Sequence, residues 1–212
     1  MKYITISGVD GSGKSTQLAL LKVKFQEAGK KIAFFHSVEF SLANRLARAA
    51  SGKDDQFVPG QSEGVTRASW FSIVLRQKFL FLDLLRFKFY VWEVKREGYD
   101  YLLSDRSFYD TLVNLMYLAE PHRPLRFQRW LWKIGMKIAD SLLTPADFAF
   151  YMDVSPEAIM ARVRPPEQGI EYLQAKTRLF KAKMSEWHMI SIDANRDKET
   201  IFQEILSKIE RI

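Results

Sequence analysis

The chain has 212 residues, of which 47% are hydrophobic and 27% are charged, and these ordinary globular values exclude a disordered or collagen-like chain. Its 32 basic and 25 acidic residues give a net charge of +7, which suits a polyanionic partner such as a nucleic acid, an acidic membrane surface or a small phosphorylated substrate. The absence of cysteine excludes a disulfide scaffold, a zinc-finger cluster and a cysteine nucleophile.

No segment of the chain predicts a membrane helix or a signal peptide. The most apolar stretch, residues 79–94, is interrupted by Asp83, Arg86 and Lys88, whereas a spanning helix needs about 20 apolar residues. The first residues lead directly into a strand-like stretch, without the apolar region of a signal peptide. We therefore expect a soluble, cytoplasmic protein with a single domain over residues 1–212.

Short apolar runs alternate with longer helical stretches along the chain. The runs are nearly continuous in apolar residues, as strands buried on both faces are, and the candidates are Tyr3–Ser7, Lys31–Phe35, Tyr101–Ser104, Phe148–Asp153 and Met189–Ile192. A helix over Lys14–Ala28 is closed by Gly29, and Ser155-Pro156 predicts the start of another helix. This alternation predicts an α/β fold of three layers, in which a parallel sheet carries helices on both faces.

Two segments interrupt the alternation. Residues 37–66 are polar and contain three glycines and a proline, which predicts a loop with a short helix. Residues 120–124 read Glu-Pro-His-Arg-Pro and predict a turn between two helices.

Residues 8–16 read Gly-Val-Asp-Gly-Ser-Gly-Lys-Ser-Thr and match the G-x-x-x-x-G-K-[ST] pattern of a phosphate-binding loop, or P-loop. Glycines let the backbone curl so that several N–H groups point into one anion-sized hollow, and the following helix adds the positive end of its dipole. In such a loop Lys14 reaches the β- and γ-phosphates of a nucleotide, and the Ser15 hydroxyl binds Mg²⁺. The predicted ATP-binding residues of the loop are Asp10, Gly11, Ser12, Gly13, Lys14, Ser15 and Thr16.

A predicted buried strand is followed directly by Asp105 and Arg106. Open α/β sheets bind their ligands at the carboxyl ends of the strands. Asp105 could there hold the Mg²⁺ shell together with Ser15, and Arg106 could clamp a phosphate with two parallel hydrogen bonds. The alternative is an ordinary Asp–Arg ion pair at the start of a helix.

Arg162 and Arg164 follow a predicted strand and a capped helix, and they lead into the Pro-Pro-Glu-Gln-Gly segment at residues 165–169. This order is typical of a lid that closes over an active site, here near residues 162–170. An arginine of the same chain can raise the rate of phosphoryl transfer about 10³–10⁵-fold. The alternative is a solvated basic helix end. The predicted catalytic residues are Lys14, Asp105, Arg106, Arg162 and Arg164.

With these motifs the chain resembles the thymidylate kinase family of nucleoside monophosphate kinases over nearly its whole length. The resemblance rests on Gly8–Thr16, Asp105-Arg106, Asp153–Arg164 and the Ile192–Asp197 stretch before the last helix. It implies a five-stranded P-loop fold, ATP and Mg²⁺ as donor and cofactor, a nucleoside monophosphate as acceptor, most of all dTMP, and a homodimer. It also implies that Asp10 faces the acceptor sugar, that Arg86 reads the acceptor base, and that Asn195 and Arg196 flank the donor adenine.

The chain departs from the family pattern in two places. The family usually has an acidic-Pro segment after its second strand, but this chain reads His36-Ser-Val-Glu-Phe-Ser, which leaves Arg45 and Arg67 as candidates for binding the acceptor phosphate. After Asp-Arg the family usually has Tyr or His and then residues of the thymine pocket, but this chain reads Ser107-Phe-Tyr-Asp. The kinase core is therefore predicted more firmly than the acceptor base.

Other functions stay open on the sequence. The Asp-Arg-Ser triplet and Glu171-Tyr172-Leu173 are also similar to deoxynucleoside kinases, in which Glu39 would be the base that acts on a 5′-hydroxyl. A second alternative is a nucleotide-dependent nucleic-acid-binding protein that uses a basic helix at residues 125–138. A third is a kinase-like module that binds ATP without turnover.

Two predicted helical stretches, residues 66–92 and 125–138, are rich in large apolar residues. Residues 66–92 hold eight aromatic residues, most of which we expect in the core or in a subunit interface. In residues 125–138, basic residues share one helical face and apolar residues another. We expect a solvated basic face over a packed apolar face, so neither a nucleic acid nor a membrane is the expected partner. The basic residues are Arg126, Arg129, Lys133 and Lys137, and the apolar ones are Phe127, Trp130, Leu131, Ile134 and Ile138.

Overall fold

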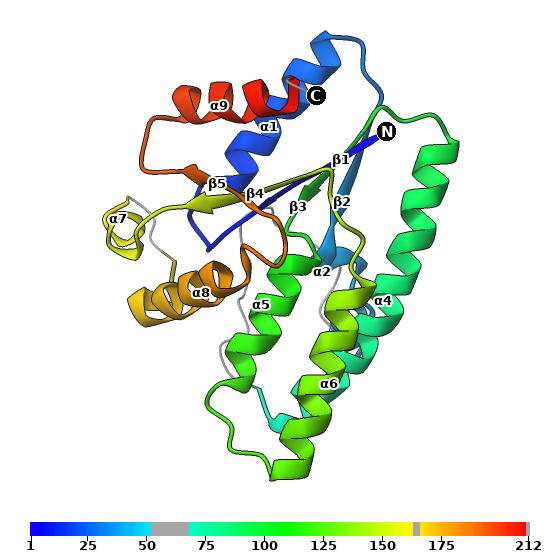
Figure 1. Cartoon of the computed structure of the whole chain (residues 1–212), viewed down its shortest axis with the longest axis vertical. Coiled ribbons are helices and arrows are strands. Elements are labelled where there is room, and N and C mark those ends of the chain that lie inside the picture. Colours follow the sequence, from blue (N-terminus) through cyan, green and yellow to red (C-terminus); the bar gives the residue numbers. More distant parts are fainter. Residues whose placement is uncertain (52–67, 163–165, 211–212) are drawn as a thin grey trace.

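A five-stranded sheet lies at the centre of the protein, and all of its strands are parallel (Figure 1). The computed structural model describes residues 1–51, 68–162 and 166–210. The strands are ordered β2-β3-β1-β4-β5 and span Lys2–Ser7 (β1), Ile32–His36 (β2), Tyr101–Asp105 (β3), Phe148–Asp153 (β4) and Ile190–Asp193 (β5). The predicted sheet is confirmed, and no strand end differs from its predicted position by more than one residue.

Helices cover both faces of the sheet, which confirms the predicted three-layer P-loop fold. Figure 1 shows α1 and α9 on one face and α4, α5 and α8 on the other, with α6 packed beside α4. The helices are α1 (Lys14–Glu27), α2 (Ser37–Phe40), α3 (Leu42–Ser51), α4 (Trp70–Arg96), α5 (Phe108–Ala119), α6 (Arg126–Leu142), α7 (Pro156–Met160), α8 (Gly169–Lys183) and α9 (Lys198–Glu210). Within the described ranges, no helix combines the length and the apolar character needed to cross a membrane.

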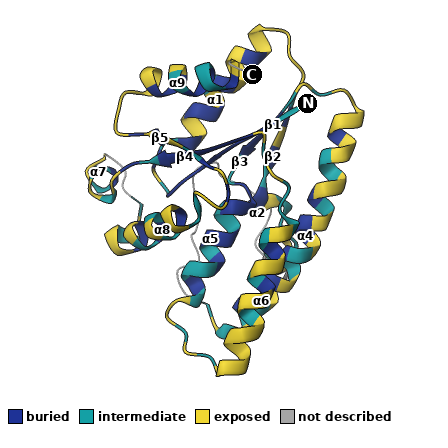
Figure 2. Cartoon of the chain, viewed as in Figure 1, coloured by how far each residue is buried: buried dark blue, intermediate teal, exposed yellow. Residues whose placement is uncertain are grey.

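The sheet also forms most of the core. Ile4, Ile6, Leu102, Leu103 and Phe150 are completely buried, and Figure 2 shows the strands as the most continuously buried part of the chain. Because helices cover both faces, the strands need apolar residues on both sides, and their sequences read as nearly continuous apolar runs. The tightly packed sheet gives the loops at its edge a rigid support.

The carboxyl ends of all five strands meet at one edge of the sheet, because the strands are parallel. In the register of the sheet, Ile6 pairs with Asp105 and Ser7 pairs with Tyr151. The segments that follow β1, β3, β4 and β5 are those in which the sequence predicts functional residues. The topology therefore brings these segments together at the edge where open α/β sheets bind ligands.

The segment after β2 contains more helix than predicted. Instead of a loop with one short helix, α2 and α3 run to Ser51, and the rest of the predicted loop lies outside the described residues. The buried carboxylate of Asp83 on α4 accepts hydrogen bonds from the backbone N–H of Leu42, at 3.2 and 3.0 Å. A side chain 41 residues away thus satisfies the first N–H group of α3, which local sequence patterns do not reveal.

The packing of α6 also differs from the prediction. Its buried residues are Gly135 and Ala139, and a Cβ atom at Gly135 would lie only 2.7 Å from the side-chain amide of Gln77 on α4. The two helices therefore approach closely through small residues of α6. The large apolar residues that we expected to be packed are exposed in the single chain, so that prediction was wrong; they are Phe127, Trp130, Leu131, Ile134 and Ile138.

Candidate active site

The P-loop connects β1 to α1 and curls around the start of the helix. Gly11 and Gly13 have φ angles of 81° and 97°, a left-handed conformation that a residue with a Cβ atom rarely adopts. The buried Lys14 side chain turns back over the loop, and its Nζ donates to the carbonyl oxygens of Gly8 at 2.9 Å and Val9 at 2.8 Å. The sequence thus produces the compact loop that places one ammonium group beside the helix N-terminus.

Ser15 and Asp105 lie in direct contact. The Ser15 hydroxyl donates to Asp105 Oδ2 at 2.8 Å, and Asp105 Oδ1 is buried with no hydrogen-bond partner. An orphaned carboxylate oxygen next to a hydroxyl, beside a phosphate-binding loop, fits a hard cation such as Mg²⁺. In the described ranges no three acidic, histidine or cysteine residues form a metal-binding group, so a cation here would complete its shell with phosphate oxygens and water.

Arg106 is held against the P-loop by Asp10. Its Nη2 donates to Asp10 Oδ1 at 2.7 Å, and its backbone has a φ angle of 58°, which is uncommon for a residue other than glycine. The Arg106 carbonyl also accepts from the Ser37 N–H at 3.0 Å. The structure therefore brings together Asp10, Arg106, Lys14, Ser15 and Asp105 at the end of β1 and β3.

Two residues of α8 that the sequence did not single out as site residues complete this group. The Tyr172 hydroxyl donates to Asp10 Oδ2 at 3.0 Å, and Lys176 Nζ donates to the Tyr172 hydroxyl oxygen at 2.8 Å. The spacing of four residues puts both side chains on one face of a helix, but only the tertiary packing buries the lysine.

The charges around Asp10 keep its carboxyl group ionised. Burial alone would raise the pKa of Asp10, but the charges of Lys176, Lys14 and Arg106, together with the Tyr172 hydrogen bond, lower the pKa to about 2. Burial lowers the pKa of Lys176, and the carboxylates of Asp10 and Asp110 oppose that shift. The site therefore concentrates positive charge around the largely buried Asp10 carboxylate.

Asp110 fastens the P-loop to α5. Its Oδ2 accepts from the Ser7 hydroxyl at 2.7 Å and from the Ser107 N–H at 3.0 Å, and Ser107 and Asp110 form a capping box at the start of α5. The Ser-x-x-Asp spacing is a local signal of such a box. Burial raises the pKa of Asp110, while Lys14 and the Ser7 hydrogen bond act in the opposite direction.

The start of the predicted lid lies on the P-loop. Arg162 Nη1 donates to the Gly11 carbonyl oxygen, and a Cβ atom at Gly11 would lie 2.9 Å from Ile159 Cγ2 of α7. Arg164, the second predicted lid arginine, lies outside the described residues. The contact brings Arg162 beside the P-loop, where the sequence predicts that it acts.

Gly11→Ala should therefore destabilise the protein. The new methyl group would press against the buried Ile159 side chain at a left-handed backbone position, and we expect the free energy of unfolding to fall by about 1–3 kcal/mol. Chemical unfolding followed by circular dichroism measures this loss. Gly29→Ala is the matched control, because its φ angle is 70° and its Cβ atom would meet nothing within 4 Å. An equal loss in both variants would contradict the tight contact between α7 and the P-loop.

Asn195 and Arg196 lie in the loop between β5 and α9. Asn195 donates from its backbone N–H and from Nδ2 to Asp193 Oδ1, at 3.0 and 2.8 Å, and it accepts weakly from the Ser155 N–H at 3.5 Å. Arg196 bonds to the Asp193 carbonyl oxygen and to Glu204. This loop is thus braced against the start of α7.

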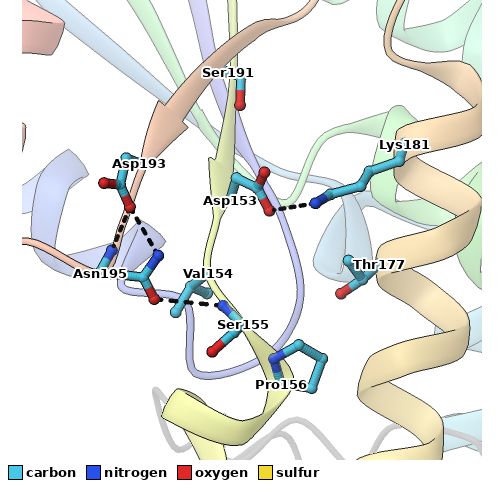
Figure 3. Close-up of a pocket in the computed structure, with 9 residues that line it drawn as sticks. All are labelled: Asp153, Val154, Ser155, Pro156, Thr177, Lys181, Ser191, Asp193 and Asn195. Carbon is cyan, nitrogen blue, oxygen red and sulfur yellow. Dashed lines mark hydrogen bonds and ion pairs between the residues drawn. The ribbon is translucent and has the colours of Figure 1, made fainter.

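A polar hollow of about 370 Å³ lies at the carboxyl ends of β4 and β5 (Figure 3). Asp153 and Lys181 face each other across it in an ion pair of 3.1 Å, and Asn195 stands at its rim with Ser155. The hollow is bordered by α8 on one side and by the β5–α9 loop on the other.

The remaining predicted acceptor-binding residues, Arg45, Arg67 and Arg86, do not form a cluster in the described part of the chain. Arg45 is exposed on α3, and Arg67 lies outside the described residues. The Arg86 guanidinium bonds to Asp83 at 2.6 Å and to the Phe40 carbonyl oxygen at 3.1 Å, and it stacks 4.3 Å from the centre of the Phe40 ring. In this structure Arg86 fastens α2 and α3 to α4.

No protein-family model matches the chain. A protein named probable thymidylate kinase from Thermococcus kodakarensis is 24% identical over 217 aligned residues, which cover 99% of this chain and 98% of that protein. Another probable thymidylate kinase, from Methanosphaera stadtmanae, is 24% identical over 213 residues, which cover 98% of this chain and 96% of that protein. From the P-loop to the last helix, the chain is therefore similar to proteins of the thymidylate kinase family.

Proposed function

We propose that the protein transfers the γ-phosphoryl group of Mg-ATP to a nucleoside monophosphate, with dTMP as the acceptor. The observation that carries the proposal is the meeting of three groups at one sheet edge: the P-loop, the Ser15–Asp105 pair and the Asp10–Arg106 pair. The names of the two relatives support dTMP as the acceptor. The proposed cofactor and donor are Mg²⁺ and ATP.

The proposed mechanism consists of positioning and charge neutralisation. Lys14 and the N–H groups of the P-loop bind the donor phosphates, and Ser15 and Asp105 hold the Mg²⁺ ion. When bound, this ion neutralises charge on the donor phosphates. Arg106 aligns the acceptor phosphate, which is already anionic at neutral pH and needs no base. Arg162 and Arg164 neutralise charge that develops during transfer, while the lid excludes water.

An ADP-release assay with Mg-ATP and a panel of acceptors tests the proposed function. The panel contains the nucleoside monophosphates, the free deoxynucleosides and single-stranded DNA. We expect turnover with dTMP. Turnover with another monophosphate would overturn the choice of dTMP while leaving the class of reaction in place.

Two outcomes of this assay would favour the alternatives. Turnover with free deoxynucleosides alone would identify a deoxynucleoside kinase. Loss of that turnover in Glu39→Gln would assign Glu39 as the base. Glu39 is exposed on α2, so the substitution should leave the fold intact. Turnover that needs single-stranded DNA would identify a nucleic-acid-dependent ATPase, and DNA binding would then weaken steeply with salt.

We further propose that the protein is a homodimer that pairs through α4. The apolar residues on one side of this helix repeat at alternating spacings of three and four, which is the pattern that packs helices against each other in coiled coils. Between Phe71 and Trp92 only Lys78 interrupts this seam, and the large apolar members of the seam are exposed in the single chain. They are Phe71, Leu75, Leu82, Leu85, Phe89 and Trp92. A second copy of the same helix is the occupant that this repeat fits, and the exposed apolar residues of α6 would extend the interface.

Leu82→Glu is expected to convert the dimer into a monomer. The substitution would bury two carboxylates in the proposed interface, and their desolvation would oppose association even with Lys78 one helical turn away. Leu82 is half exposed in the single chain, so the fold should survive. Light scattering after size-exclusion chromatography measures the mass. Lys24→Glu, at an exposed position of α1 on the other face of the sheet, should remain a dimer, and a monomeric wild-type protein would contradict the proposed interface.

A further inference from the structure

Lys176 is a buried lysine behind the P-loop. Only 7% of the residue is exposed, and its Nζ lies 2.8 Å from the Tyr172 hydroxyl oxygen and 4.8 Å from the centre of the tyrosine ring. A buried ammonium group loses much of its hydration, and an apolar side chain of similar volume often stabilises such a position at least as well. Packing alone therefore does not account for a lysine here.

The chemistry of the three groups fixes the direction of their hydrogen bonds. The Lys176 ammonium group can only donate, and the ionised Asp10 carboxylate can only accept. The Tyr172 hydroxyl, which contacts both, must therefore accept from Lys176 and donate to Asp10. Lys176, Tyr172 and Asp10 form a polarised chain whose far end is occupied by Arg106, which donates to the other carboxylate oxygen of Asp10.

Two cations act on the Asp10 carboxylate: Arg106 contacts it directly, and Lys176 is connected to it through Tyr172. Arg106 contacts Asp10 at the carboxyl edge of the sheet, and its side chain is 24% exposed. Lys176 reaches Asp10 through Tyr172 from the protein interior. If Arg106 turned toward an anionic ligand and Lys176 were absent, the largely buried Asp10 carboxylate would keep only the Tyr172 hydrogen bond and the charge of Lys14.

We propose that Tyr172 and Lys176 are positioning residues, which hold Asp10 in place while Arg106 binds an anionic acceptor. This inference rests on the proposed phosphoryl transfer and names the residues that prepare its acceptor side. The charged groups that face Lys176 are Asp10 and Lys14 of the P-loop, and Arg106 and Asp110 after β3. Of the cations that lower the pKa of Asp10, Lys176 has the largest effect, which agrees with this role.

The test compares Tyr172→Phe and Lys176→Met with Arg178→Met. Arg178 lies on the same helix but is exposed, and it pairs with Glu120 away from the site. In the two site variants we expect kcat/KM for dTMP to fall about tenfold or more, which is the effect of losing one hydrogen bond to a charged group. The KM for ATP should change less than about twofold, because Lys14 and the P-loop backbone remain unchanged. Arg178→Met should match the wild-type protein.

A double variant separates a connected chain from two independent effects. If Lys176 acts on Asp10 through Tyr172, the two substitutions should not be additive. The double variant Tyr172→Phe/Lys176→Met should then have nearly the same kcat/KM for dTMP as the less active of the two single variants. Additive losses, equal losses for ATP and dTMP, or variants that match Arg178→Met would each overturn the inference.

The experiment distinguishes this inference from the proposed function. An inactive wild-type protein would refute the proposed phosphoryl transfer, and the inference, which rests on it, would fall with it. An active wild-type protein with unaffected site variants would refute the positioning role alone. Should Lys176→Met fail to fold, Tyr172→Phe decides the question, because phenylalanine fills the same space and removes only the hydroxyl group.

Discussion

Replacing Lys14 with methionine is expected to lower kcat by at least about 10²–10³-fold, the effect of removing one preorganised group that stabilises charge in the transition state. The Lys14 ammonium group is buried, and its contacts to Gly8 and Val9 place it over the P-loop. Methionine keeps much of the aliphatic stem but removes the charge that would neutralise the donor phosphates. Steady-state kinetics with saturating ATP and dTMP measure the loss.

Lys24→Met is the control for this variant. Lys24 lies on the same helix but is exposed, so its substitution should leave kcat within about twofold of the wild-type value. Thermal unfolding of both variants checks that the fold is retained. A folded Lys14→Met variant with full activity would refute the assignment of residues 8–16 as a catalytic phosphate-binding loop.

Arg162→Ala is the second substitution with a large expected effect. Its guanidinium group contacts the Gly11 carbonyl oxygen of the P-loop, which places the positive charge beside the proposed phosphate site. An arginine that neutralises charge in the transition state is worth about 10³–10⁵ in kcat. We expect kcat to fall toward this range while the KM for ATP changes much less, since the contribution arises mainly in the transition state.

Arg123→Ala provides the comparison, because Arg123 is exposed in the turn between α5 and α6. Its kinetics should match those of the wild-type protein. A variant Arg162→Ala with unchanged kcat would remove this residue from the mechanism, and Arg164 would then be the lid arginine to examine. A rise in KM with constant kcat would instead indicate uniform binding of ATP.

The sheet could be predicted because its signals are local. Parallel strands covered by helices on both faces need short, nearly continuous apolar runs, and β4 has the same bounds in the sequence-based prediction and in the structure. The helices α2 and α3 could not be predicted in the same way. Their position depends on Asp83, which lies on another helix and satisfies the N–H of Leu42.

In the candidate site, too, the residues of local motifs could be predicted, and those brought in by tertiary packing could not. The glycines, Lys14 and Ser15 of the P-loop lie in one short motif, and the strand before Asp105 predicted its place at the sheet edge. The partners of Asp10 on α8 lie more than 160 residues away along the chain, so no local pattern connects them. Lys176 differs from the other lysines of α8 in being buried beside the site, which only the tertiary structure shows.

The prediction for α6 failed because the amphipathic pattern was assigned to packing within one chain. Small residues face α4, and Gly135 contacts the Gln77 side chain closely. The large apolar residues of the same helix are left on the surface. A helical pattern identifies an apolar face, but it does not say whether the partner belongs to the same chain.

The most direct test of the central claim follows the phosphoryl group itself. The protein is incubated with [γ-³²P]ATP, Mg²⁺ and either dTMP or thymidine, and the labelled products are separated by thin-layer chromatography. The proposed function predicts labelled dTDP from dTMP and no labelled product from thymidine. Labelled dTMP formed from thymidine, or labelled inorganic phosphate as the sole product with either acceptor, would contradict it.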